Sequence, residues 1–266
     1  MRVRDALGRE HDFTEPPQQV VSLVPSITET LFVLGLAEQI VGVTDFCIHP
    51  AQALRTKTRV GGTKNPLLER ILELNPDLVL ANKEENRRRD VEWLEQAGVR
   101  VFVTYARTVQ EAVEEIHLLA RLTRTEDRAQ PLLAEIEEEI QEAKSRMSER
   151  RPRVVALIWK KPYMAVGGNT FAHDLMLQCG GENPFQNAPR RYPRIDENEL
   201  VVAEPELILL PTEPFAFAEA DRLELMQLDC PAAREGRIHV IEGELLSWYG
   251  PRMARALRVL SRLIVS

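Results

Sequence analysis

The chain has 266 residues, of which 44% are hydrophobic and 28% charged, a composition typical of a globular protein with a sizeable core. Its formal net charge of −7 argues against a nucleic-acid partner, because a phosphate-binding surface needs an excess of basic residues. No apolar run reaches the roughly 18 residues that a membrane-spanning helix needs, which argues against insertion into a membrane.

The first half of the chain alternates predicted strands with predicted helices. Strand 20–24 leads into a helix over 27–36, and Ser26 and Glu29 form an S-x-x-E capping box at the start of that helix. Further strands are expected at 40–44, 77–81 and 99–106, with helical segments near 67–74, 88–98 and 109–122. This alternation predicts an α/β fold with a parallel sheet that helices cover on both faces.

The second half repeats this plan. Strands are expected at 153–159, 206–210 and 237–243, with helices at 170–181 and 221–228 and a last helix from Pro251. The segment LLERILELNPDLVLA of the first half is echoed by DENELVVAEPELILL, since both place an acidic helical turn before a Pro-acidic pair and an apolar strand. The echo predicts two related Rossmann-like lobes.

A one-sided amphipathic helix is predicted between the halves. Apolar residues recur at spacings of three and four, and a helix of about 20 residues would be roughly 30 Å long; these residues are Leu133, Ile136, Ile140, Ala143 and Met147. We expect an N-terminal lobe over 1–124, a connecting helix over 125–150 and a C-terminal lobe over 151–266. The alternative is a surface helix that lies on one lobe.

Aromatic residues gather in the segments that follow the predicted strands, where open α/β sheets bind their ligands. Only 6% of the chain is aromatic, so this concentration is informative. It indicates a ligand cleft between the lobes for a flat or bulky small molecule, although some of the rings are expected to seal loops onto the core. The rings are those of Phe46, Tyr163, Tyr192, Phe215, Phe217, Trp248 and Tyr249.

Glycine-rich motifs and reactive residues are also present. VGGTKN and VGGNTF match no phosphate-binding motif and indicate turns that let a ligand approach the backbone. Cys47, His49 and His173 could form a metal site or the reactive set of an enzyme. Ser26 lacks the G-x-S-x-G elbow of a nucleophilic serine. Three widely spaced cysteines, at 47, 179 and 230, give no disulfide framework, and a single bridge stays open.

Four segments together resemble a known family: VVSLVPSITETLFVLGLAEQIVGVT, LLERILELNPDLVLA, LMLQCGGENPF and ELVVAEPELILL. They are similar to the solute-binding proteins of the helical-backbone metal receptor superfamily, and in pattern most nearly to its cobalamin-binding members. The resemblance implies two α/β lobes joined by one long helix. It also implies a non-enzymatic protein that binds a cobalamin-like corrinoid, an iron chelate or another metal chelate for an ABC importer, without a cofactor.

The resemblance also implies site residues. Pro25 and Ser26 match a ligand-contacting turn, and Trp248 and Tyr249 lie on a loop expected to belong to the C-terminal lobe and to face the ligand. Thr63 and Asn82 stand where cobalamin binders often have Trp, so the expected ligand surface has fewer aromatic side chains than theirs. The expected ligand-binding set is Pro25, Ser26, Phe46, Thr63, Asn82, Tyr163, Tyr192, Trp248 and Tyr249, with no catalytic residue and no metal ligand. Replacing Trp248 with Ala is expected to weaken binding and to leave unfolding nearly unchanged.

The family docks on its permease through one surface Glu on each lobe. Glu69 matches the first position, and the second falls on Asn198, which Glu197 and Glu199 flank. The alternative is ordinary helix N-terminal charge. The resemblance implies a periplasmic or extracellular monomer, whereas the N-terminus shows no export signal and, if the chain is full length, favours the cytoplasm. A cytoplasmic carrier or sensor of the same fold and an enzyme acting on a metal-cofactor precursor are the alternatives.

Overall fold

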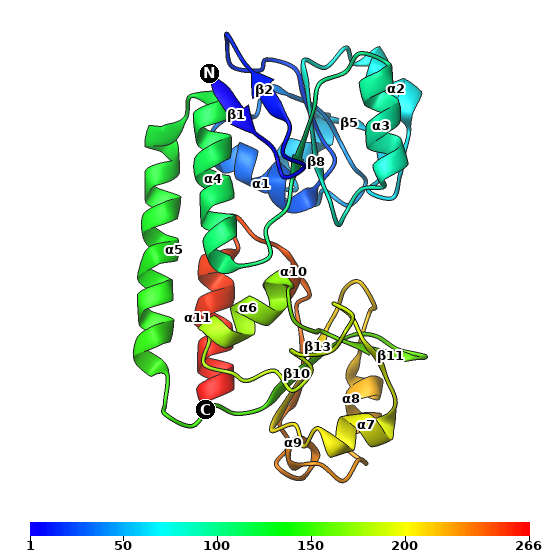
Figure 1. Cartoon of the computed structure of the whole chain (residues 1–266), viewed down its shortest axis with the longest axis vertical. Helices are drawn as coiled ribbons and strands as arrows, with labels where there is room; N and C mark the ends of the chain where they lie inside the picture. Colours follow the sequence, from blue (N-terminus) through cyan, green and yellow to red (C-terminus); the bar gives the residue numbers. More distant parts are fainter. The chain divides into compact units, whose positions relative to one another are not determined.

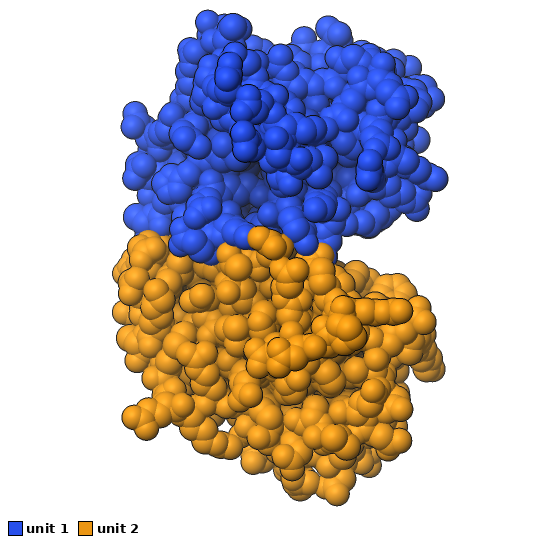
Figure 2. Space-filling model, in the orientation of Figure 1, with its two compact units in different colours: residues 1–106, 110–134, 249–251 blue, residues 107–109, 135–248, 252–266 orange.

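The computed structural model describes residues 1–266, which form two compact units (Figure 2). Unit 1 comprises residues 1–106, 110–134 and 249–251, and unit 2 comprises residues 107–109, 135–248 and 252–266. Each unit contains its own five-stranded sheet. The predicted α/β class is therefore confirmed.

The sheet of unit 1 is parallel throughout, with the strand order β5-β4-β3-β8-β9 (Figure 1). Strands β3, β8 and β9 are buried along their whole length, which explains their nearly continuous apolar sequences. The strands are Val20–Ser22 (β3), Ile40–Val43 (β4), Thr58–Arg59 (β5), Leu78–Asn82 (β8) and Val101–Thr104 (β9). The helices are Pro25–Val33 (α1), Leu68–Glu73 (α2), Arg88–Gln96 (α3), Val109–Thr123 (α4) and the 3₁₀ turn Ala53–Thr56 (η1), and a short hairpin pairs Gly61–Gly62 (β6) with Asn65–Pro66 (β7).

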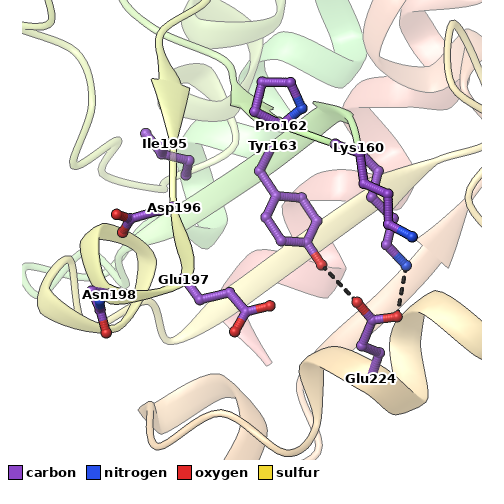
Figure 3. Close-up of a pocket in the computed structure, with 9 residues that line it drawn as sticks. Lys160, Pro162, Tyr163, Ile195, Asp196, Glu197, Asn198 and Glu224 are labelled. Carbon is purple, nitrogen blue, oxygen red and sulfur yellow. Dashed lines mark hydrogen bonds and ion pairs between the residues drawn. The ribbon is translucent and has the colours of Figure 1, made fainter.

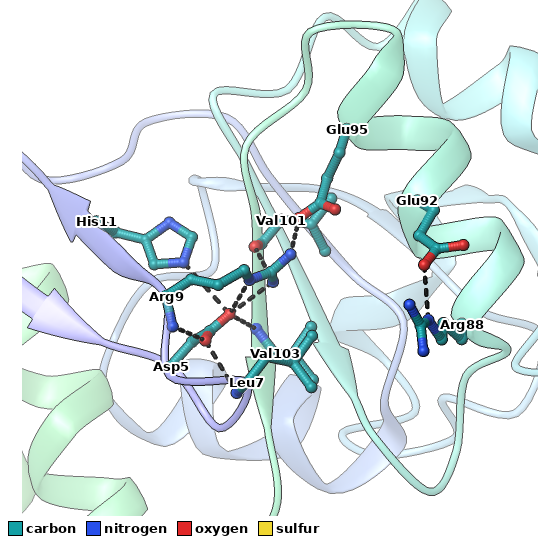
Figure 4. Close-up of polar contacts among 9 residues, drawn as sticks. All are labelled: Asp5, Leu7, Arg9, His11, Arg88, Glu92, Glu95, Val101 and Val103. Atoms are coloured by element: carbon teal, nitrogen blue, oxygen red, sulfur yellow. Dashed lines mark hydrogen bonds and ion pairs between the residues drawn. The ribbon is translucent and has the colours of Figure 1, made fainter.

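An N-terminal hairpin, Arg2–Arg4 (β1) with Glu10–Asp12 (β2), packs beside β9 and was not predicted. The N–H of Ala6 donates to the carbonyl of Val103 at 2.8 Å, which joins the hairpin to the sheet. The buried Asp5 carboxylate accepts the N–H groups of Leu7 and Arg9 and the Arg9 guanidinium (Figure 4). Burial opposes the charge of Asp5, but these bonds to Arg9 hold its pKa below the usual value.

The sheet of unit 2 is mixed, with the strand order β12-β11-β10-β13-β14. Strands β10, β13 and β14 are parallel, whereas β11 and β12 are antiparallel additions at the edge. No strand was predicted between 153–159 and the helix at 170–181, but Lys161 lies in the left-handed region and the chain turns straight back as β11. The strands are Val154–Trp159 (β10), Tyr163–Ala165 (β11), Arg194–Ile195 (β12), Leu207–Pro211 (β13) and Ile238–Ile241 (β14), and the helices are Phe171–Gln178 (α6), Glu197–Val202 (α7), Glu219–Leu225 (α8), Pro231–Arg234 (α9), Glu244–Ser247 (α10) and Met253–Val265 (α11).

The long helix α5 spans Glu126–Arg146, within the residues predicted for the connecting helix. It contributes residues to both units. In unit 2 its charged face meets α11, where Arg258 Nε donates to Glu139 Oε1 at 2.6 Å. The predicted apolar seam is buried at Ile136, Ile140 and Ala143. None of the helices combines the length and apolarity that a membrane span requires.

The predicted capping box at Ser26 is wrong. Helix α1 begins two residues earlier, with Val24 as the N-cap and Pro25 at the first helical position. Proline suits this position because its φ is already helical and its missing N–H would have had no partner in the helix. Ser26 is consequently a buried helical residue, and its carbonyl accepts a hydrogen bond from the Thr30 hydroxyl.

Candidate functional site

The carboxyl edge of the sheet in unit 1 gathers several of the predicted ligand residues. Strand β3 ends at Ser22, and Pro25 and Ser26 open α1 three and four residues later. Phe46 follows β4 and exposes 59% of its surface. A methyl group added to Gly62 would lie 3.2 Å from Phe46 Cε2, so the ring rests against the β6–β7 hairpin beside Thr63. Phe46 is therefore an exposed aromatic side chain on a supported loop.

Asn86 connects three of these loops. Its side-chain oxygen accepts the N–H of Asn82 at 2.8 Å. Its amide group donates to the carbonyls of Leu23 at 3.3 Å and Thr63 at 3.0 Å. Asn86 is buried, so these three hydrogen bonds fix the backbone at Thr63 and Asn82. Asn86 was not among the predicted site residues, although it lies in the polar segment that follows the predicted strand 77–81.

Asn82 and Tyr249 meet at the end of β8. The Asn82 amide donates to the Tyr249 hydroxyl and, at 3.2 Å, to Thr104 Oγ1. We predicted that Tyr249 belongs to the C-terminal lobe, but residues 249–251 lie in unit 1. Gly250 allows this return of the chain because it has a φ of +89° and lies against Ser26 and Thr30, where a side chain would collide.

Two polar side chains near Asn82, those of Glu115 and Tyr249, are uncharged. Burial raises the pKa of Glu115 to about 8, although hydrogen bonds from the Thr104 side chain and the Tyr105 backbone favour its charged form. Burial also raises the pKa of Tyr249 well above its usual value, and the nearby Glu115 adds to this shift. Both groups are therefore protonated near pH 7.

In unit 2, the predicted strand-end aromatic residues Phe215 and Phe217 lie beside Trp159, which our sequence analysis missed. Trp159, the last residue of β10, is 43% exposed. Its ring packs edge-on against Phe215 with centroids 5.7 Å apart, and Phe215 packs in the same way on the buried Phe217 at 4.7 Å. The signal was present: a large aromatic residue ends the apolar run RVVALIW, where the strand leaves the core.

Trp248 is largely buried, at 7% exposure. Its ring N–H donates to Glu213 Oε1 at 2.8 Å, and the Arg252 guanidinium lies 5.4 Å from its ring centroid. Such a residue contributes to packing whatever else it contacts. The expectation that its removal leaves unfolding unchanged is therefore wrong.

The side chain of Tyr163 packs in the hydrophobic core of unit 2 and is 7% exposed. Figure 3 shows its ring between β11 and Glu224. Its hydroxyl lies 3.4 Å from Glu224, and Lys160 Nζ binds both Asp221 at 2.6 Å and Glu224 at 2.7 Å. Hydrogen bonds to these two carboxylates raise the pKa of Lys160, and burial raises that of Tyr163 to about 12. A hollow of about 450 Å³ lies beside this cluster, and Glu197 lines it.

Tyr192 is half-buried beside the VGGNTF turn. The Arg191 guanidinium lies 5.6 Å from its ring centroid. The backbone around it is fixed, because the N–H of Ala165 donates to the carbonyl of Pro193 at 3.0 Å. The N–H of Gly167 donates to the carbonyl of Arg191 at 2.8 Å, so the glycine-rich turn lies against the segment that carries Tyr192.

The three predicted docking residues differ in their surroundings. Glu69 and Glu197 are exposed in the first turns of α2 and α7. Glu199 closes a capping box with Asp196, each side chain accepting the other's backbone N–H at 2.8 Å. The carboxylate of Glu199 therefore caps the N-terminus of its own helix, α7. This fits the alternative that these acidic residues are ordinary charges at a helix N-terminus.

Cys47 and His173, two residues of the metal or enzyme alternative, lie close to neighbouring polar groups. Cys47 is fully buried, its sulfur lies 3.2 Å from the Thr28 and Thr44 hydroxyls, and burial raises its thiol pKa. His173 Nδ1 lies 3.1 Å from the Asn183 amide, and burial lowers its pKa. No group of three or more His, Cys, Asp or Glu residues in the structure could hold a metal ion. Cys47 is thus a poor nucleophile.

Comparison with known proteins identifies the family. The periplasmic binding protein family model matches residues 20–244. The chain belongs to the periplasmic binding protein family. Its members are binding proteins, which confirms the predicted non-enzymatic class and the resemblance described above.

Several relatives can be named. A vitamin B12-binding protein of Vibrio parahaemolyticus is 25% identical over 244 residues, which are 91% of this chain and 88% of that protein. The structure of the periplasmic vitamin B12-binding protein of Vibrio cholerae is similar with a TM-score of 0.80 and 22% identity, covering 94% of this chain and 97% of that one. A periplasmic haem-binding protein of Pseudomonas aeruginosa has a TM-score of 0.81 and 25% identity, covering 94% and 93%.

Proposed function

We propose that this family member binds a cobalamin-like corrinoid or a related metal chelate and presents it to an ABC importer. The observation that carries the proposal is the exposed aromatic ring at the carboxyl edge of each sheet, Phe46 in unit 1 and Trp159 in unit 2. Aromatic rings suit the flat face of a macrocycle. Vitamin B12-binding relatives that align over most of the chain support the same ligand class.

The proposed binding makes and breaks no covalent bond. Apolar contacts to the ligand come from Phe46. Asn82 is buried and its amide already donates to Tyr249 and Thr104, so we assign it a supporting role behind the surface that carries Phe46. We assign Pro25, Ser26 and Thr63 to the same surface, and Tyr163, Tyr192 and Trp248 to supporting positions in unit 2.

We further propose that the protein works outside the cytoplasmic membrane as a monomer. Family membership supports this location. Glu69 and Glu197 are the better docking candidates, because both are exposed, whereas Glu199 caps its own helix. Neutralising both residues should slow transport by a reconstituted importer and leave ligand affinity unchanged.

A titration tests the proposal. Purified protein is titrated with cyanocobalamin, dicyanocobinamide, haemin and a ferric siderophore, and absorbance and heat are followed together. We expect saturable one-to-one binding of at least one macrocycle, and a loss of about tenfold in its affinity on Phe46→Ala. Leu223→Ala, which removes an exposed apolar side chain on α8, is the control. Failure of all four compounds to bind would overturn the proposal.

A further inference from the structure

The exposed ring of Phe46 lies on a tight turn over residues 44–47. The N–H of Cys47 donates to the carbonyl of Thr44 at 3.1 Å, which closes a four-residue β-turn with Phe46 at its third position. Thr44 and Cys47 are fully buried, whereas Phe46 exposes 59% of its surface. The N–H of Asp45 donates to the carbonyl of Gly61 at 2.9 Å, so the turn is joined to the β6–β7 hairpin. The ring therefore projects from a turn that the rest of unit 1 holds in place.

One side chain, that of Arg59, binds both ends of this turn. Arg59 is the last residue of β5, which pairs with β4 at the edge of the sheet. Its Nη1 donates to the carbonyl of Thr44 at 2.7 Å and to that of Cys47 at 2.9 Å. Because Thr44 and Cys47 are fully buried, their carbonyl groups are shielded from water and need donors from the protein. One guanidinium nitrogen thus fixes the two backbone positions that flank Asp45 and Phe46.

Arg59 differs from the other contacts of the turn because its side chain lies outside the core. Cys47 anchors the turn from the inside, where its sulfur lies 3.2 Å from the hydroxyls of Thr28 and Thr44. A substitution there would change the packing of the core as well as the turn. Arg59 is only half-buried, and its side chain makes its hydrogen bonds to this turn. Its contribution to the place of Phe46 can therefore be separated from that of the core.

We propose that Arg59 is a positioning residue for ligand binding, which holds the turn so that the Phe46 ring keeps one place before the ligand arrives. The inference rests on the proposed function and adds a residue that acts through Phe46. A loop that becomes ordered only on binding costs free energy, and a preorganised loop avoids that cost. Hydrogen bonds from a charged donor are stronger than neutral ones, so a guanidinium group is well suited to fix the turn.

A double-mutant cycle tests this role. Arg59→Met, which removes the donors but keeps a long side chain, is combined with Phe46→Ala. Arg59→Gln, with a shorter polar side chain, enters the same cycle, so that the test does not depend on the folding of one variant. Arg55→Met, which removes an exposed arginine of η1, is the matched control. Calorimetry measures affinities for cyanocobalamin, dicyanocobinamide, haemin and a ferric siderophore, and thermal unfolding verifies that each variant is folded. Hydrogen exchange of the Cys47 amide reports on the turn in the absence of a ligand.

We expect Arg59→Met to weaken ligand binding about fivefold when Phe46 is present and by less than about twofold in the Phe46→Ala background, because the ring whose place it sets is then absent. Exchange of the Cys47 amide should become at least about fivefold faster in ligand-free Arg59→Met. Equal losses of affinity in both backgrounds, lower stability without a loss of affinity, or an unchanged exchange rate would overturn the inference and leave the proposed function intact. Binding of none of the four compounds would remove both.

Discussion

Asp77 and Glu206 occupy equivalent places in the two units, and each carboxylate holds the backbone where the adjacent parallel strand begins. Asp77 accepts the N–H groups of Gln18 at 2.6 Å and Gln19 at 3.1 Å, just before β3. Glu206 accepts the N–H of Arg153 at 3.0 Å, just before β10. In both units a six-residue helix, a residue with positive φ and a proline precede the acid.

The first prediction concerns this shared device. Asp77→Ala should lower the free energy of unfolding by about 0.5–1.5 kcal/mol, because two exposed backbone N–H groups before β3 lose their charged acceptor and water replaces it. Urea unfolding measures the change. Glu73→Ala, at an exposed position of α2, is the matched control and should change stability by less than about 0.5 kcal/mol. Equal effects of the two substitutions would show that the Asp77 contacts contribute nothing.

The internal echo made this part of the fold predictable. The repeated pattern is local in the sequence: a helix, then a proline and an acidic residue, then an apolar strand. The structure has this order in both units, with α2 before β8 and α7 before β13. Strand and helix types were predictable wherever the sequence has a clear period, as in α4 and α5. The edge strands β11 and β12 were not, because each is short and is stabilised only by its neighbours.

The candidate site was less predictable than the fold. Phe46 could be found because it follows a predicted strand in a loop, where exposure is common. The return of Tyr249 to unit 1 could not be found, since it depends on a contact with Asn82, 167 positions away in the chain. The burial of Trp248 likewise depends on Glu213, in a loop that no local pattern connects to it.

The second prediction concerns Asn86, which joins the loops after β3, β6 and β8. Asn86→Asp keeps the acceptor for the N–H of Asn82 but replaces the amide donor with a carboxylate that faces the carbonyls of Leu23 and Thr63. We expect a loss of about 2–4 kcal/mol in unfolding free energy, since a buried charge would face two acceptors. Chemical unfolding measures it, and ligand affinity should fall as the loop at Thr63 loosens.

A matched change on the surface provides the control for Asn86. Asn75 is exposed at the end of α2, and Asn75→Asp should cost far less stability. Stability losses of similar size at the two positions would contradict the role assigned to Asn86.

The third prediction is a pH dependence that Glu115 sets. Its pKa is raised from 4.5 to about 8 in the folded protein, so the folded state keeps a proton that the unfolded state releases above pH 4.5. Stability associated with this group is therefore fully present below pH 4.5, falls as the pH rises and is lost by about pH 8. Glu115→Gln should flatten the fall in thermal unfolding temperature across this window.

The exposed neighbour Glu114 provides the comparison for Glu115. Glu114→Gln should leave the pH profile of the wild type unchanged, because this neighbour on α4 is exposed to solvent, whereas Glu115 is buried. Parallel profiles for wild type and Glu115→Gln would mean that Glu115 is already charged at neutral pH.

The fourth prediction separates the three tryptophans by burial. Trp159→Ala should weaken binding of the macrocycle about tenfold. It should change the free energy of unfolding by less than about 1 kcal/mol, because an exposed ring contributes more to ligand binding than to the stability of the fold. Trp248→Ala should instead lower unfolding free energy by about 3–5 kcal/mol, since it removes a buried ring and the hydrogen bond to Glu213. Trp93→Ala, on the surface of α3, should affect neither quantity. Calorimetry and denaturant unfolding on the same three variants measure both effects, and unchanged affinity in Trp159→Ala would exclude its ring from the binding surface.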